Sequence, residues 1–142
     1  GKTIDELVSL IDLPTTVLTA GGADVPDVFR GRPLQKLAAG KADDWGDDVF
    51  VQISEAELGR AVRTRRWKYG ITAPDPADWI DGHHGSKRYT ESHLYDLEAD
   101  PHERNNLVDD PALSEVRDEM RQRIVKHMVE VGEVEPQIAP AS

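Results

Sequence analysis

The side chains best suited to chemistry gather in a polar stretch at residues 73–92, where His83 and His84 are followed closely by Lys87 and Arg88. Adjacent histidines in an extended chain point apart, whereas zinc ligands must converge, so a metal site is not expected here. A titrating imidazole and two cationic side chains could instead contact an anionic substrate. We therefore name these four residues as candidates for the rim of a substrate site. The alternative to substrate contact, and the default interpretation of this stretch, is an exposed, solvated loop.

Two charged clusters precede this stretch, one basic and one acidic: Arg60, Arg63, Arg65 and Arg66, and Asp43, Asp44, Asp47 and Asp48. The basic cluster lacks the interleaved aromatic residues of a nucleic-acid groove, so solvated strand faces or ion pairs are expected. The acidic cluster lacks the ligand spacing and closing glutamate of an EF-hand. We interpret it as a solvated turn.

The chain has 142 residues, no cysteine and a formal net charge of -10. Its length suits one modest core, either a single domain or a piece of a larger one. The lack of cysteine excludes a disulfide, a thiolate nucleophile and a cysteine-based zinc site. The negative charge argues against nucleic acid and anionic membranes as partners. No apolar run is long enough to span a bilayer and no leader follows Gly1, which leaves the compartment open.

The elements that must position these residues begin with a short apolar helix. Pro14 would break a helix that starts near Thr3, but it fits the first turn of one capped by Ser9. Gly21 and Gly22 are expected to end it. Residues 4–8 before it are then extended or a short strand. The helix is too short and apolar to stand alone, so it needs a large surface to pack on.

A run of strands is predicted next. Residues 25–37 contain several breakers and predict an ordered loop pinned by Phe29, Leu34 and Leu37. Alternation in residues 48–54 predicts a strand, and residues 59–64 and 67–72 predict a hairpin. Residues 73–92 are interpreted as a long loop, and residues 93–97 as the last strand.

The final predicted element is a covering helix. Asp100 should accept nearby backbone N–H groups after the last strand, and Asp110 with Pro111 should begin the helix. One apolar stripe predicts that it lies on a core, and Gly132 should end it; the stripe is Leu113, Val116, Met120, Ile124 and Met128. The predicted fold class is therefore α+β, with a small antiparallel sheet of about four strands carrying a carboxy-terminal helix.

Four stretches, in this order, resemble motifs of type I sulfatases. SLIDLPTTVLTAGG resembles their S-x-x-D-x-x-P-T-x-x-x-x-x-G helix, with Pro14 shifted to the position before Thr15, and FRGRPLQKL resembles the following G-x-S-L-x-x-L loop. RAVRTRRWKYGI is similar to their R-A-V-R-T-x-x-x-K-Y hairpin. LYDLEADPHERNNL is similar to their L-Y-D-L-x-x-D-P-x-E-x-x-N-L turn before the final helix, and it is the most specific of the four.

The resemblance implies the carboxy-terminal portion of an arylsulfatase-like enzyme of the alkaline phosphatase superfamily. It places residues 1–40 at the end of an α/β/α catalytic domain, to which the first helix would belong. Residues 41–132 would form the sheet-and-helix subdomain, and residues 133–142 a tail. The amino-terminal catalytic domain of the same protein is then the expected partner, with self-association through the exposed first helix when that domain is absent.

The resemblance also implies that the parent protein hydrolyses small sulfate esters, using a formylglycine nucleophile and a divalent cation, calcium, that both lie upstream. Neither C-x-P-S-R nor S-x-P-S-R occurs in this chain. The chain by itself is therefore expected to be inactive, without a catalytic or metal-binding residue of its own. Its expected role is to buttress the catalytic domain and to shape the access of the substrate.

Two other interpretations stay open at this point. Within the same superfamily, the parent could be a phosphodiesterase or a phosphonate hydrolase, and the upstream nucleophile would discriminate. From a different class, the chain could be a stand-alone interaction module that docks through its apolar first helix. A reading frame that continues upstream into a nucleophile motif would exclude the module.

Overall fold

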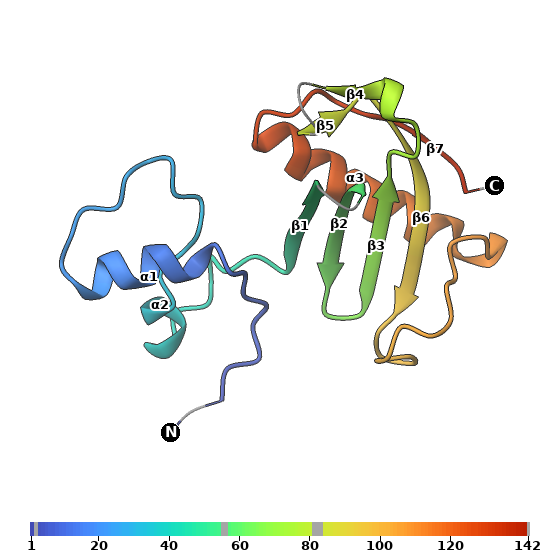
Figure 1. Ribbon diagram of the computed structural model, residues 1–142. Coiled ribbons are helices and arrows are strands. Elements are labelled where there is room, and N and C mark those ends of the chain that lie inside the picture. Colours follow the sequence, from blue (N-terminus) through green and yellow to red (C-terminus); the bar gives the residue numbers. More distant parts are fainter. Residues whose placement is uncertain (2, 55–56, 81–83, 142) are drawn as a thin grey trace. The chain divides into compact units, whose positions relative to one another are not determined.

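The computed structural model describes residues 1, 3–54, 57–80 and 84–141. The chain divides into two compact units, Gly1–Val49 and Phe50–Ser142, and each is described by itself (Figure 1). In the described ranges, no helix combines the length and the apolar character needed to cross a membrane.

The first unit contains the predicted helix, α1 (Asp12–Ala20), and one further turn of helix, α2 (Gln35–Ala38). The predicted Ser9 cap is wrong, because α1 begins at Asp12 and has no side-chain cap. The Asp12 carboxylate instead accepts the backbone N–H groups of Ser9 and Arg32, both at 2.8 Å. The contact with Arg32, twenty residues further along the chain, thus fixes the start of α1. Gly21 ends the helix as predicted, and Gly22 has a positive φ of 68°.

The loop between these helices lies directly against the first turn of α1. A Cβ at Gly31 would stand 1.9 Å from the carbonyl oxygen of Ile11, so only glycine fits there. Leu37 is buried as predicted, but Phe29 is 38% exposed and does not pin the loop in this unit. Residues 4–8 form neither helix nor strand.

The second unit is built on a five-stranded sheet in the order β1-β2-β3-β6-β7. The predicted strand is β1 (Asp48–Ser54), and the predicted hairpin is β2 (Leu58–Thr64) with β3 (Trp67–Thr72). β3 pairs antiparallel with β6 (Arg88–Asp96), with a register shift after Gly70. β7 (Gln137–Ala139) adds to β6 in parallel at the edge. The α+β prediction is confirmed, although the sheet has five strands where about four antiparallel ones were predicted, and its edge strand β7 is parallel.

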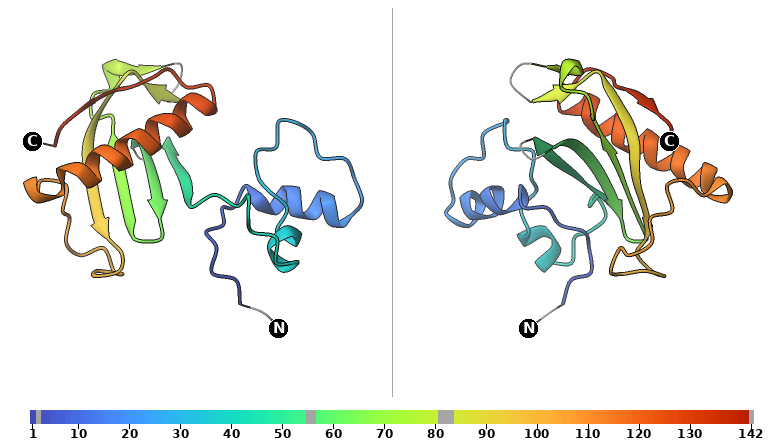
Figure 2. Two further views of the ribbon diagram at one scale, coloured as in Figure 1. Left: turned by 180° about the vertical axis from the view of Figure 1, so that it is seen from behind. Right: turned by 45° about the vertical axis from the view of Figure 1, so that its right-hand side comes forward.

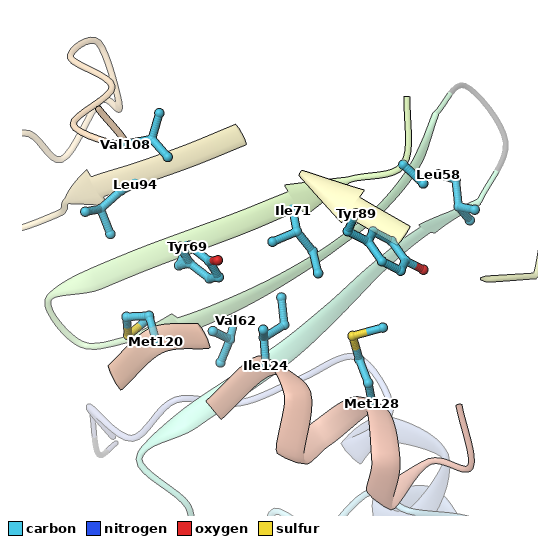
Figure 3. Close-up of a cluster of buried hydrophobic side chains, with 11 residues drawn as sticks. Leu58, Val62, Tyr69, Ile71, Tyr89, Leu94, Val108, Met120, Ile124 and Met128 are labelled. Atoms are coloured by element: carbon cyan, nitrogen blue, oxygen red, sulfur yellow. The ribbon is translucent and has the colours of Figure 1, made fainter. Parts of the chain in front are cut away.

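One long helix, α3 (Ser114–Glu130), crosses one face of this sheet (Figure 2, left). A 3-10 turn, η2 (Pro111–Leu113), precedes it, and Asp110 caps that turn by accepting the N–H of Ala112. Met120, Ile124 and Met128 are at most 1% exposed, which confirms the predicted stripe. Figure 3 shows them facing buried sheet residues. The core thus lies between α3 and the sheet, and Gly132 ends the helix region with a φ of 92°.

The predicted loop at residues 73–92 is wrong in its extent. It contains a 3-10 turn, η1 (Pro76–Asp78), and a two-stranded sheet of β4 (Trp79–Ile80) and β5 (Gly85–Ser86). β6 also begins at Arg88 rather than at His93. Strands of two residues are too short to show an alternation of apolar and polar side chains, so the sequence could not reveal β4 and β5. The early part of β6 is a strand because it pairs with β3 and β7, which are distant in sequence.

The turn-rich stretch after β6 works through side chains that accept backbone hydrogen bonds. Asp100 accepts from Arg104 and Asn105, as predicted, and these bonds lower the pKa of its carboxyl group, the bond from Asn105 contributing most. The Asn106 side chain accepts from Leu94 and Val108, which joins β6 to the approach of α3. The Glu103 carboxylate pairs with the Lys68 ammonium.

Candidate functional site

Three of the four predicted rim residues lie within residues 84–88, hereafter the rim loop, which contains β5 and ends at the first residue of β6. His84, Lys87 and Arg88 are all exposed, and the Arg88 guanidinium lies 3.8 Å from the carboxylate of Asp78. His83 lies outside the described residues. The three described side chains share one short segment, and their role in binding stays a prediction.

The rim loop rests on buried polar groups. Ser86 is 2% exposed, and its hydroxyl accepts the N–H of Arg88 and lies within 3.0 Å of the carbonyl oxygen of Asp78. The Ser86 N–H donates to the phenolic oxygen of Tyr89, also buried. Burial raises the pKa of the Tyr89 phenol, so this oxygen stays protonated and is a neutral acceptor. These bonds fix the backbone and leave the cationic side chains in solvent.

Below the rim loop lies a buried ion pair. The Arg60 side chain is 0% exposed, and its Nε donates to the Glu133 carboxylate at 2.8 Å. Its other nitrogens donate to the carbonyl oxygens of Ile53, Gly59 and His84, the last at 2.6 Å. A guanidinium has a fork of donors that suits several acceptors at once. Arg60, on β2, therefore ties the rim loop to β1 and to Glu133, which follows the end of α3.

The remaining basic and acidic clusters behave largely as the sequence indicates. Arg66 pairs with Asp96 at 2.8 Å, and Arg63 and Arg65 are exposed. Arg60 is the exception, since its ion pair is buried rather than solvated. In the acidic turn, Asp43, Asp44 and Asp47 are exposed and Asp48 is partly so.

Sequence reasoning missed a cavity of about 200 Å³ on the face of the sheet opposite α3. Lys68 and Glu103 pair at 2.5 Å on its wall, and the Lys68 ammonium lies 5.9 Å from the ring centre of Tyr95. The His93 ring stacks on Tyr95 and contacts the Ser92 hydroxyl. Glu103 has a positive φ of 54°, unusual for a residue other than glycine. The sequence did carry one signal for this pair: Lys68 occupies a fixed position of the hairpin motif, and Glu103 occupies a fixed position of the turn motif.

Lys87 and Arg88 expose positive charge on the rim loop. Among the described residues, no three histidine or acidic side chains converge in a way that could hold a cation. The chain also carries neither form of the sulfatase nucleophile motif. The described residues thus offer no set of side chains that fits a calcium ion.

Comparison with known proteins supports one class. Residues 1–130 match the model of the family described as N-sulphoglucosamine sulphohydrolase, C-terminal. The chain therefore belongs to this family of sulfatase carboxy-terminal regions. The expected resemblance to the carboxy-terminal portion of a sulfatase is confirmed, and neither the phosphodiesterase nor the stand-alone module is favoured.

Individual proteins that are similar to this chain are consistent with the family match. An arylsulfatase from Clostridium perfringens is 27% identical over 128 residues, covering 90% of this chain and 24% of that protein. A solved 2-O GAG sulfatase is 26% identical with a TM-score of 0.64, covering 84% of this chain and 24% of the other. A protein solved with its substrate D-glucosamine-2-N,6-O-disulfate shares the fold, with 21% identity, a TM-score of 0.70 and coverage of 88% of this chain and 24% of the other. The chain thus spans about a quarter of the length of each of these relatives.

Proposed function

We propose that this chain is the carboxy-terminal part of a sulfatase that hydrolyses sulfate esters. The observation that carries the proposal is the family match over residues 1–130, which includes the four motif-like stretches. The relatives named as sulfatases are about four times as long, which leaves ample chain for a catalytic domain. A sulfuric ester hydrolase is therefore the activity proposed for the whole protein.

The catalytic groups of this enzyme would lie in the amino-terminal part. There, a formylglycine nucleophile would attack sulfur, and a divalent cation, calcium, would stabilise negative charge on the transferring group. Residues of the present chain would buttress that domain and border the route of the substrate. His84, Lys87 and Arg88 suit the second role, because the exposed Lys87 and Arg88 cations attract a sulfate ester from solution and the His84 imidazole can form a hydrogen bond with it.

The test is a sulfate-ester hydrolysis assay on the full-length gene product and on residues 1–142 alone. The intact mass of the full-length product should first show a chain that extends beyond these residues. We expect hydrolysis of an arylsulfate by the longer protein and none by residues 1–142. An arylphosphate and a phosphodiester serve as matched controls with a different transferring group.

Two results would contradict the proposal. Hydrolysis of the phosphodiester but not of the arylsulfate would move the parent to another branch of the superfamily. A native chain of only this length, monomeric and inert toward every ester, would remove the enzymatic function altogether.

A further inference from the structure

The segment that follows α3 was predicted to be a tail, yet the structure ties it to the rim loop at two points. This segment, hereafter the strap (residues 133–139), leaves α3 after Gly132 and runs beside the start of β6. Its first contact is through Glu133, and its second is through β7. The first reaches His84 through the Arg60 side chain, and the second reaches Lys87 and Arg88 directly, although both are far from the strap in sequence.

The first contact is the buried bond from Arg60 to Glu133. The Glu133 side chain is 18% exposed, and Arg60 is fully enclosed. The Arg60 guanidinium donates to this carboxylate and also to the carbonyl oxygen of His84, the latter at 2.6 Å. Removing one partner of a buried pair leaves an uncompensated charge, which is unfavourable. Glu133 therefore holds Arg60 in place, and Arg60 holds the backbone of His84.

The second contact is a backbone ladder. The Gln137 N–H donates to the carbonyl oxygen of Lys87 at 2.8 Å. Beyond that bond, Arg88, Tyr89 and Thr90 pair in parallel with residues 137–139. Both ends of the rim loop are thus fastened through backbone atoms, at His84 by Arg60 and at Lys87 by Gln137.

We propose that the strap is a positioning device, which fixes the rim loop and thereby sets how tightly the enzyme binds its sulfate-ester substrate. This inference rests on the proposed function for its consequence in binding. The physical reason is preorganisation, since a loop held in place before binding loses less conformational entropy when it meets its ligand. Glu133 and Gln137 act through the loop and do not themselves touch the substrate.

The decisive variant is Gln137→Pro in the full-length protein, because it removes the N–H that bonds to Lys87. Gln137 is the first residue of β7, a position at which a strand tolerates proline, and its side chain is exposed. Gln137→Ala keeps the N–H and is the matched control. Glu133→Gln tests the other contact independently, because it removes the charge that faces Arg60 while it keeps the shape.

Two measurements separate positioning from general damage. Amide hydrogen exchange should become faster at residues 84–88 in Gln137→Pro and in Glu133→Gln, with exchange in α3 unchanged. The KM for an arylsulfate should rise about 2- to 10-fold in both variants, the range expected for one net hydrogen bond, while kcat stays close to the parent value. Gln137→Ala should leave all three quantities unchanged.

The inference is overturned if exchange in the rim loop does not change in Gln137→Pro, since the strap would then not hold the loop. It is also overturned if exchange becomes faster while KM stays the same. If the unmodified full-length protein does not hydrolyse sulfate esters, the proposed function fails, and the exchange experiment still decides whether the strap fixes the loop.

Discussion

At the scale of single residues, this chain uses carboxylates mainly to hold its own backbone and cations. Asp12, Asp100 and Asp110 each accept backbone N–H groups at a turn or a helix start. Glu91 is buried and accepts from both Tyr69 and Arg121 beneath α3. The acidic side chains that the sequence presents as a large negative charge are therefore partly structural.

Asp96 gives a pH-dependent contribution to stability whose sign can be derived. The hydrogen bond from Arg66 is the main cause that lowers the pKa of its carboxyl group, and the N–H groups of Ala99 and Glu98 act in the same direction. Because the folded pKa lies below the unfolded value of about 3.9, the contribution is present above that pH and is lost as the pH falls through the lowered pKa. We predict that Asp96→Asn lowers the Tm at pH 7 and that this difference shrinks below about pH 4.

The control for this experiment is Asp109→Asn, which removes the same charge from an exposed position in the same unit. Its Tm should follow that of the parent protein across the pH series. Thermal unfolding followed by circular dichroism from pH 3 to pH 7 provides the measurement. A constant Tm difference for Asp96→Asn at all pH values would contradict the proposed origin of its stability.

At the scale of elements, α3 is held to the sheet by three fully buried side chains, whereas its other face is polar. Ile124 is the central one and is 0% exposed, with Met120 and Met128 about one turn away on either side. Since the intrinsic stability of a single helix is marginal, packing of this stripe must supply most of the energy that keeps α3 in place. The sheet in turn depends on α3 to cover its apolar face.

We therefore predict that Ile124→Ala lowers the free energy of unfolding by about 2–5 kcal/mol, through the lost burial and the cavity it leaves. Val129→Ala on the same helix is the matched control, because Val129 is 50% exposed. The control should change the stability by less than about 0.5 kcal/mol. Urea unfolding of the full-length protein and its variants measures both values, and equal effects at the two positions would contradict this assignment of the core.

At the scale of the whole molecule, the first unit leaves apolar side chains of α1 and its approach in solvent. Leu10 is 81% exposed and Val17 is 69% exposed, with Ile11 and Leu13 also exposed. An apolar surface of this kind marks an interaction site or a tendency to aggregate. In the Clostridium perfringens arylsulfatase, about three quarters of the sequence lie outside the part matched by this chain, so the proposed parent protein would have room for a domain that covers this surface.

We expect residues 1–142, expressed alone, to self-associate through this helix. The double variant Leu10→Lys with Val17→Lys should reduce the association, because it places charge on the exposed face. Size-exclusion chromatography with light scattering over a range of concentrations provides the measurement. The matched control carries two lysine substitutions at Gln122 and Val129 of α3, which are also exposed. A monomer at all concentrations, or equal effects of both double variants, would contradict a role for α1.

Local patterns determined much of this structure in advance. The stripe from Leu113 to Met128 specified α3 and the face it buries, because its period matches the helical repeat. The alternation and spacing of residues 59–72 specified the hairpin, since its partners are neighbours in sequence. The motif-like turn after β6 identified the family, and its Asp100 accepts the hydrogen bonds that the sequence predicted.

Only the tertiary structure decided the features that depend on distant partners. Residues 137–139 form a strand because β6 offers its edge, and three residues between two prolines carry too little pattern to show it. Arg60 is buried because Glu133, 73 residues away, neutralises it, although its sequence neighbours suggest a solvated cation. The start of α1 is set by Arg32 for the same reason. Sequence thus determined the elements whose signals are local, and long-range pairing decided how the rim loop is held.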